Sequence, residues 1–183
     1  MADVSVRPAA AEDAPVLAAV QVSAWRTGYA VLLPRATLDA MASQQDVFAE
    51  QWETATTRPP SRVHRVLVAC EGAQVVGGAA IGPASDDDLN PAVAAEIHSF
   101  VVDPQRRRLG HGSRLLSAAV DFMRGDGFVS ATVWVDGNDD PSRALFAASG
   151  WAPDGSHRTL DLEGDGTVTV QQVRLHTDLA EGS

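Results

Sequence analysis

Several residue types are scarce in this chain of 183 residues: it contains one cysteine, one tyrosine and no lysine. The single thiol, Cys70, excludes an internal disulfide and lies in an apolar run, where a cysteine usually packs as a small hydrophobe. No apolar stretch approaches the length of a membrane span, and no basic segment precedes a long apolar run at the start of the sequence. We therefore expect a soluble, cytoplasmic protein that does not enter a membrane.

Positive charge is also scarce, with 14 basic against 24 acidic residues and a formal net charge of -10. An acidic surface repels nucleic acid, so we expect no nucleic-acid partner. Three adjacent carboxylates, Asp86 to Asp88, lack the spaced partners of a metal site and indicate a solvated loop. The apolar fraction of 45% is sufficient for one core, so we expect a single domain over residues 1–183 and no metal ion.

The absence of lysine bears directly on the stretch from Phe100 to Val120, FVVDPQRRRLGHGSRLLSAAV. Here an apolar strand pattern leads through an Arg- and Gly-rich turn into a helical pattern. Gly110 and Gly112 let a ligand approach the backbone, and the free N–H groups and dipole of a helix start suit a phosphate. A nucleoside triphosphate loop requires a lysine, and a dinucleotide loop requires a small residue where Leu115 stands. The turn therefore predicts a phosphate site of another kind.

The spacing of this turn points to one family. The R-x-x-G-x-G pattern at Arg107, Gly110 and Gly112, preceded by Pro104, resembles the acyl-CoA loop of the GNAT superfamily of N-acyltransferases. The resemblance implies that acetyl-CoA is the acyl donor, with its phosphates on the loop and its pantetheine arm paired with the strand before it.

Other segments share the resemblance, which covers most of the chain. An apolar run at 129–135 is followed by Asn138 and by SRALFAASGW from Ser142 to Trp151, which is similar to the second block of the family. Near the start, VRP at 6–8 and the Trp25-Arg26-x-x-Tyr29 pattern resemble members that act on small molecules. The cofactor-binding residues implied by the resemblance are Phe100, Val101, Val102, Arg107, Arg108, Leu109, Gly110, His111, Gly112, Ser113, Asn138, Ser142 and Phe146.

Residue patterns and the resemblance together predict the fold. Periodicity indicates strands near 4–7, 65–70, 75–81, 94–102, 129–135, 151–162 and 167–176, with helices near 16–29 and 112–124 and one or two more between 34 and 58. Strands that alternate with helices and end in a hairpin imply a mixed sheet with helices on both faces. The resemblance implies an α/β (α+β) fold with a mostly antiparallel sheet of six or seven strands, splayed between the fourth and fifth strands.

Two residues on the strand before the loop are candidates for the base that deprotonates an amine. Glu96 lies fourteen residues before Gly110, the spacing at which family members carry a strand glutamate, and His98 is the second candidate. The period of two places both on one strand face, where they could act alone, together or through water. The family's usual acid is a tyrosine, and Phe146 occupies the matching position here. Tyr29, Ser142 or water could replace it, and a thiolate can also leave without full protonation.

Trp25, Tyr29 and Trp134 are candidates for the lining of the amine pocket, whereas large aromatic residues at helical or strand spacing are also typical of a core. The function predicted is transfer of an acetyl group from acetyl-CoA to a primary amine of a small molecule, such as an amino acid, a polyamine or an amine antibiotic, by a monomer or homodimer. Two alternatives stay open. The absence of the family's tyrosine at Phe146 suits a non-catalytic sensor that binds acyl-CoA, and a protein acetyltransferase would act on lysine or N-terminal amines.

Overall fold

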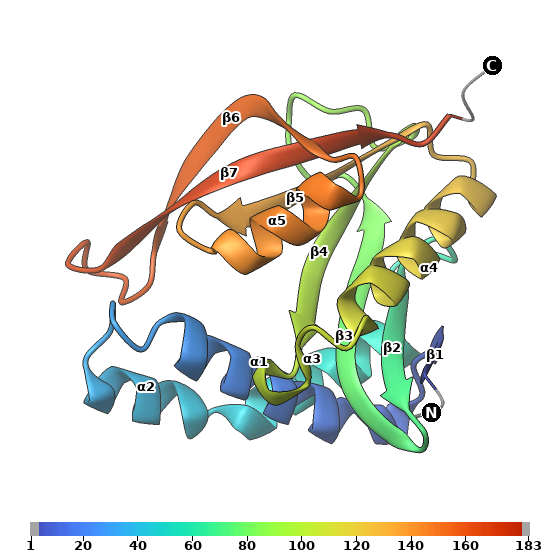
Figure 1. Ribbon diagram of the computed structural model, residues 1–183. Coiled ribbons are helices and arrows are strands. Elements are labelled where there is room, and N and C mark those ends of the chain that lie inside the picture. Colours follow the sequence, from blue (N-terminus) through green and yellow to red (C-terminus); the bar gives the residue numbers. More distant parts are fainter. Residues whose placement is uncertain (1–3, 181–183) are drawn as a thin grey trace.

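A computed structural model of the protein describes residues 4–180 and shows one seven-stranded sheet in the order β1-β2-β3-β4-β5-β7-β6 (Figure 1). Among these strands only β4 and β5 run parallel, and the other neighbours are antiparallel. This sheet confirms the predicted fold. The strands are β1 (Val4–Pro8), β2 (Arg65–Glu71), β3 (Gln74–Pro83), β4 (Ala94–Val102), β5 (Ser130–Asp136), β6 (Ala152–Asp161) and β7 (Thr169–Asp178).

Helices cover both faces of the sheet (Figure 1). The helices α4 and α5 pack over one apolar core, and α1 and α3 pack over a second core on the opposite face. None of the helices within residues 4–180 is both long and apolar enough to cross a lipid bilayer. The helices are α1 (Ala14–Gly28), α2 (Arg35–Ala42), α3 (Gln45–Thr57), α4 (His111–Gly125) and α5 (Asp140–Ala148).

The central strands β2 and β3 are apolar almost throughout because helices cover them on both sides. A glycine on β3 permits the close approach of α1 to the sheet. A Cβ at Gly78 would overlap the side chain of Leu17, so the glycine lets α1 lie directly on β3. The two cores are thus joined through one sheet, as expected for a single domain. The ends of the predicted domain, residues 1–3 and 181–183, lie outside the described part, and the domain range stays a prediction.

The sheet opens between β4 and β5, as predicted. The two strands pair only between residues 94–97 and 130–133, although β4 continues to Val102 and β5 to Asp136. The second half of β4 therefore has a strand partner only on its β3 side among the described residues. A bulge opposite the Ala80–Ile81 junction leaves His98 without a register partner on β3, at the point where β5 departs. The free edge leads from His98 to the Arg- and Gly-rich turn.

Candidate active site

The segment between β4 and α4 forms a tight turn. It begins with a single 3₁₀ turn, in which the carboxylate of Asp103 accepts a hydrogen bond from the N–H of Gln105 at 2.9 Å. Arg108 and Gly110 then adopt left-handed backbone conformations, with φ of 64° and 84°. The second of these suits glycine, which lacks the Cβ that makes the conformation unfavourable, and it turns the chain directly into α4.

The main chain of this turn offers a set of unused donors. Within residues 4–180, no hydrogen bond uses the N–H groups of residues 109–113. Residues 111–113 form the first turn of α4, where N–H groups have no intrahelical acceptor and the helix dipole adds partial positive charge. This geometry suits the phosphate group that the sequence predicts there.

Glu71, at the end of β2, anchors the turn to the rest of the sheet. Its Oε2 atom lies 2.9 Å from Nη1 of Arg106 and 3.5 Å from Nε2 of His111. The His111 side chain is buried, so His111 can offer a ligand only its main chain. Arg106 likewise points toward β2 and is partly neutralised there.

Three other arginines remain near the turn. Arg107 and Arg108 are exposed, and Arg114 places Nη1 3.4 Å from the carbonyl oxygen of Leu109. Guanidinium groups bind phosphate oxygens well because their N–H donors are paired in one plane. The structure thus adds Arg114 to the predicted pair, and its position in the first turn of the predicted helix is a signal that could have identified it.

One face of strands β4, β5 and β7 carries polar side chains. Glu96 pairs in register with Thr132, and Trp134 pairs with Arg174, so these residues share a face. Asp136 follows on the same side of β5, whereas the alternate residues of β5 enter the core under α4 and α5. We call Glu96, Thr132, Trp134, Asp136 and Arg174 the polar face.

The two predicted base residues lie together at the start of the free edge. Glu96 is 5% exposed, and its Oε2 accepts hydrogen bonds from the N–H of Ser85 at 2.9 Å and from the Ser85 hydroxyl at 2.6 Å. Its Oε1 lies 3.6 Å from Nδ1 of His98, whose side chain is 33% exposed. The pair therefore consists of an enclosed carboxylate and an imidazole that a ligand can reach, although the bulge at His98 interrupts the period of two behind the prediction.

The environment of Glu96 makes it a strong anion and a weak base. Burial by itself raises the pKa of Glu96, but the nearby His98 imidazole and the two hydrogen bonds from Ser85 favour the carboxylate more strongly and lower the pKa to about 2. Glu96 is therefore ionised throughout the neutral range. A carboxylate with so low a proton affinity suits orientation of a neighbouring group better than removal of a proton at neutral pH.

A second imidazole lies behind this pair. Nδ1 of His64 is 2.8 Å from the Ser61 hydroxyl, and the ring covers Gly82, the register partner of Glu96. A Cβ at Gly82 would lie 2.7 Å from the His64 ring, so only glycine leaves room for it. Burial, and then the nearby His98, lower the pKa of His64, which keeps its ring neutral at physiological pH.

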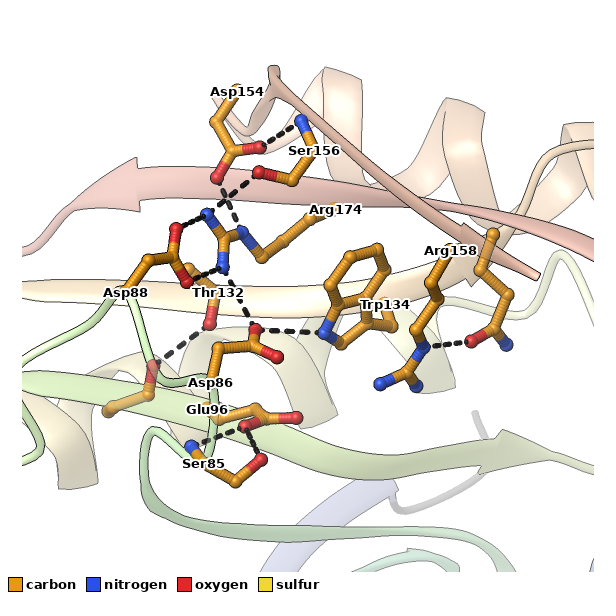
Figure 2. A network of polar contacts seen from close by, with 12 residues as sticks. Ser85, Asp86, Asp88, Glu96, Thr132, Trp134, Asp154, Ser156, Arg158 and Arg174 are labelled. Atoms are coloured by element: carbon orange, nitrogen blue, oxygen red, sulfur yellow. Dashed lines mark hydrogen bonds and ion pairs between the residues drawn. The ribbon is translucent and has the colours of Figure 1, made fainter. Parts of the chain in front are cut away.

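Arg174 lies at the centre of a network on the polar face (Figure 2). It is 4% exposed and donates to both carboxylate oxygens of Asp88, at 2.8 and 2.6 Å, and to Asp86 at 3.0 Å. A further N–H reaches Asp154 at 2.6 Å, and these bonds, led by that to Asp88, raise the pKa of Arg174. The loop at Asp86 to Asp88 is exposed at Asp87 and Asp88, as expected for a solvated loop, but the carboxylates of Asp86 and Asp88 also bind a buried cation, which the sequence did not predict.

No set of three histidine, cysteine, aspartate or glutamate side chains within residues 4–180 is arranged to hold a metal ion. The carboxylates of Asp86 and Asp88 are directed to Arg174 instead (Figure 2).

Two of the aromatic residues predicted for an amine pocket lie in different places. Trp134 donates its Nε1–H to Asp86 at 3.0 Å, and the Arg158 guanidinium lies 4.3 Å from its ring centroid. Trp25 packs edge-on against Phe48 of α3, with ring centroids 5.0 Å apart. Trp134 is thus part of the polar face, and Trp25 belongs to the contact between two helices.

The hydroxyl groups predicted as alternative acids are both engaged. The hydroxyl of Tyr29, at the end of α1, donates to Asp136 at 2.8 Å, and burial followed by the Asp136 charge raises the pKa of Tyr29. The Ser142 hydroxyl donates to Asp139 at 2.6 Å. Either group would lose a hydrogen bond to a carboxylate if it gave its proton to a thiolate. The contact of Tyr29 does bring α1 to the open end of β5, beside the polar face.

Phe146 lies in the core. It is 1% exposed and packs between Phe100 and Trp151, at centroid distances of 5.5 and 5.2 Å. Contact between its ring and a cofactor would require the ring to leave this stack. Asn138, by contrast, is exposed in the turn before α5.

Two residues of this region carried no functional signal in the sequence. Ser85 stands in a loop that looked merely polar, and Arg174 stands within the last strand as one cation among many. An arginine in an otherwise half-apolar strand could have indicated a buried ion pair, because an unpaired charge is rarely buried.

Comparison with known proteins identifies the same family that the sequence motifs resemble. The model of the acetyltransferase (GNAT) family matches residues 25–151, which include the turn, β4 and β5. YuaI of Bacillus subtilis (strain 168), described as an uncharacterized N-acetyltransferase, is 30% identical over 146 residues, which are 79% of this chain and 78% of that protein.

Solved structures share the fold. The PaiA N-acetyltransferase of Thermoplasma acidophilum, in complex with coenzyme A, has a TM-score of 0.70 at 16% identity and covers 93% of this chain and 98% of its own. The ribosomal-protein-alanine N-acetyltransferase of Brucella melitensis has a TM-score of 0.70 at 22% identity and covers 95% and 99%. With the family model matching more than half of its residues, the chain belongs to the acetyltransferase (GNAT) family.

Proposed function

We propose that this protein transfers the acetyl group of acetyl-CoA to the primary amine of a small molecule. The observation that carries the proposal is the free edge of β4, which connects two chemically different ends. The turn with its unused N–H groups lies at one end, and His98 with Glu96 lies at the other. A thioester laid along this edge would have its phosphates at the turn and its acetyl group beside the imidazole.

The donor would be held mainly by the main chain. The N–H groups of residues 109–113 suit the pyrophosphate, with Arg107, Arg108 and Arg114 around it. The backbone of residues 100–102 would pair with the pantetheine arm like an added strand, and Asn138 would contribute from the turn before α5. The coenzyme A complex of PaiA, which has the same fold, supports this assignment.

His98 is the proposed base, because its imidazole is accessible to a ligand and Glu96, with its low pKa, is a weak base at neutral pH. The acceptor ammonium gives one proton to His98, which passes it to water, and Glu96 stabilises the imidazolium that forms. The neutral nitrogen attacks the thioester carbonyl, while a backbone N–H on the β4 edge can stabilise the oxyanion. The C–S bond then breaks, and the second proton lost by the nitrogen ends on the sulfur of coenzyme A.

No protein acid is required for the departing thiolate. A thiol has an ordinary pKa of ~8.5, so its thiolate is a fair leaving group near neutral pH. This agrees with the engagement of Tyr29 and Ser142 with carboxylates and with the burial of Phe146.

The surroundings of the polar face favour a small acceptor. The Tyr29–Asp136 hydrogen bond fixes the end of α1 against β5, and Thr37 of α2 donates to Glu163 in the β6–β7 turn at 2.6 Å. Figure 1 shows this hairpin reaching toward α2. Elements from both ends of the chain thus border the acceptor side, where Trp134 lies partly exposed on the polar face.

Release of the coenzyme A thiol across a panel of acceptors tests the proposal. The panel includes amino acids, polyamines, amine antibiotics, and peptides with a free N-terminus or a lysine. We expect turnover on a small amine that exceeds hydrolysis without acceptor. Preference for the peptides would replace the small acceptor with a protein, as in the ribosomal-protein-alanine enzyme. Calorimetric binding of acetyl-CoA without turnover on any amine would overturn the proposal in favour of a sensor.

A further inference from the structure

We propose that Arg174 is a positioning residue of the active site: it holds the β3–β4 loop, residues 84–93, so that Ser85 stays hydrogen-bonded to Glu96. The inference rests on the proposed function, because Glu96 would act in catalysis through His98.

The middle of the β3–β4 loop depends on Arg174 for its attachment. The ends of the loop are tied by backbone bonds, from Ala84 to Ala94 and from residues 129 and 130 to Val93. Between them, Asp86 and Asp88 bind Arg174, and Asp86 also accepts the Trp134 N–H. Asp88 has a side-chain exposure of 61%, so burial alone would not retain this part of the loop.

Arg174 is itself fixed from the opposite side. Its Nε–H donates to Asp154 at 2.6 Å and an Nη2–H donates to the Ser156 hydroxyl at 2.9 Å, both on β6. With the three bonds to the loop, all five guanidinium donors are used. Figure 2 shows the guanidinium between the β6 side chains and the carboxylates of the loop. A lysine has three donors and could not replace these bonds.

The bonds of Asp86 determine the position of the residue before it. Ser85 contributes both its N–H and its hydroxyl to a single oxygen of Glu96, which requires the backbone and side chain of Ser85 to be placed together. Figure 2 shows Ser85 and Glu96 next to Asp86. Without Arg174, Ser85 would be held only by the Ala84–Ala94 backbone bond before it and the Trp134–Asp86 bond after it. Release of Asp86 and Asp88 from Arg174 would therefore weaken the bonds of Ser85 to Glu96, although Arg174 is hydrogen-bonded to neither residue.

Few titratable groups face Glu96, so loss of the Ser85 hydrogen bonds has a predictable effect on the pKa of Glu96. His98 faces it from β4, with His64 beyond, whereas its register partners Gly82 and Thr132 are uncharged. The bonds from Ser85 favour the carboxylate, so their loss raises the pKa of Glu96 from about 2 toward its ordinary value of 4.5. Because the pKa of Glu96 is lowered on folding, its ionisation stabilises the fold at pH values above 4.5. This stabilisation is lost as the pH falls toward 2.

A double-mutant cycle with Arg174→Gln and Ser85→Ala tests the proposal. We expect each single variant to lower kcat about 10-fold, because a small misplacement of the Glu96–His98 pair weakens proton transfer. The KM for acetyl-CoA stays within twofold, and the double variant is no slower than the slower single one. Losses that multiply, or an unchanged kcat in Arg174→Gln, would overturn the proposal.

Two further variants separate positioning from folding. Asp88→Asn weakens the attachment at an exposed side chain, so the protein should fold if Arg174→Gln does not, with kcat lowered about threefold. Arg7→Gln is the matched control, because it breaks an arginine pair with Asp13 of 2.7 and 2.9 Å on the opposite sheet edge. We expect it to lower stability and leave kcat unchanged. Equal loss of kcat in Arg7→Gln would show that Arg174 acts only through overall stability.

Titration of the Glu96 carboxyl carbon by NMR gives a readout that needs no activity. Its resonance is identified by its absence in Glu96→Gln. In the parent protein it should show no protonation down to pH 4, whereas in Arg174→Gln and Ser85→Ala it should titrate near its ordinary range. Identical titration in the parent and Arg174→Gln would refute the role of Arg174. Lack of acetyl transfer by the parent would instead refute the proposed function.

Discussion

The turn before α4 and the polar face are built in opposite ways. The turn presents the main-chain N–H groups of five consecutive residues, 109–113, which are unpaired within the described part of the chain, and its shape follows from local conformations such as that of Gly110. The polar face uses side chains from three strands and depends on the β3–β4 loop. Damage to the turn should therefore change donor binding, and damage to the polar face should change turnover. Each of the following substitutions tests one side of this division.

The largest effect is expected on the polar face. His98→Ala should lower kcat about 100-fold or more, because general base catalysis typically contributes that much, and the KM for acetyl-CoA should change less than twofold. His157→Ala is the control, since His157 is an exposed histidine on β6. Steady-state kinetics at saturating amine gives the comparison. A loss below threefold would mean that water or Glu96 removes the proton and that His98 only occupies the site.

The next effect is expected at the turn. Joint substitution Arg107→Glu and Arg108→Glu should raise the Kd for coenzyme A about 30-fold, because attraction to the pyrophosphate becomes repulsion, and should leave kcat at saturating donor nearly unchanged. The loss should shrink at high salt, since both side chains are exposed. Arg35→Glu on α2 serves as a control for charge reversal at an exposed arginine away from the turn. A fall in kcat without a change in Kd would contradict the division between the two regions.

A smaller effect distinguishes backbone strain from ligand contact. Gly110 and Gly72 both have left-handed conformations, with φ of 84° and 59°, so either change to alanine should cost ~1 kcal/mol of unfolding free energy. A Cβ at Gly110 would displace the Arg114 guanidinium, whereas nothing lies within 4 Å of one at Gly72. We expect the Kd for coenzyme A to rise about fivefold only in Gly110→Ala. Equal binding by the two variants would remove the turn from the donor site.

The same division explains what could be predicted from the sequence. The strands, the turn and the helix after it were found because periodicity and glycine spacing are local properties. The pairing of Ser85 with Glu96 was not found, nor was the contact of Asp88 with Arg174, 86 residues away. Such contacts depend on strand register and on a bulge that periodicity does not reveal, and the resemblance could not supply residues outside its own motifs. The placement of Phe146 in the core likewise required the packing of α5 on β4.

Phe146→Tyr is expected to have the smallest effect on rate, and it tests whether the polar face needs an acid. The tyrosine expected from the family would be restored, but its hydroxyl would enter the stack between Phe100 and Trp151 rather than reach a thiolate. Since a buried hydroxyl without a partner costs ~1–3 kcal/mol, stability to denaturant should fall while kcat stays within twofold.

Phe128→Tyr supplies the comparison, because Phe128 is another buried ring of the same core and lies just before β5, away from the free edge. Loss of stability without a change of kcat in both variants would show that thiolate departure needs no added acid. A several-fold rise in kcat for Phe146→Tyr alone would instead mean that this ring leaves the core when the donor binds. The tyrosine on α5 would then supply the proton to the departing thiolate. The active site would in that case consist of three parts: the main-chain donor site, the side-chain acceptor site and the acid on α5.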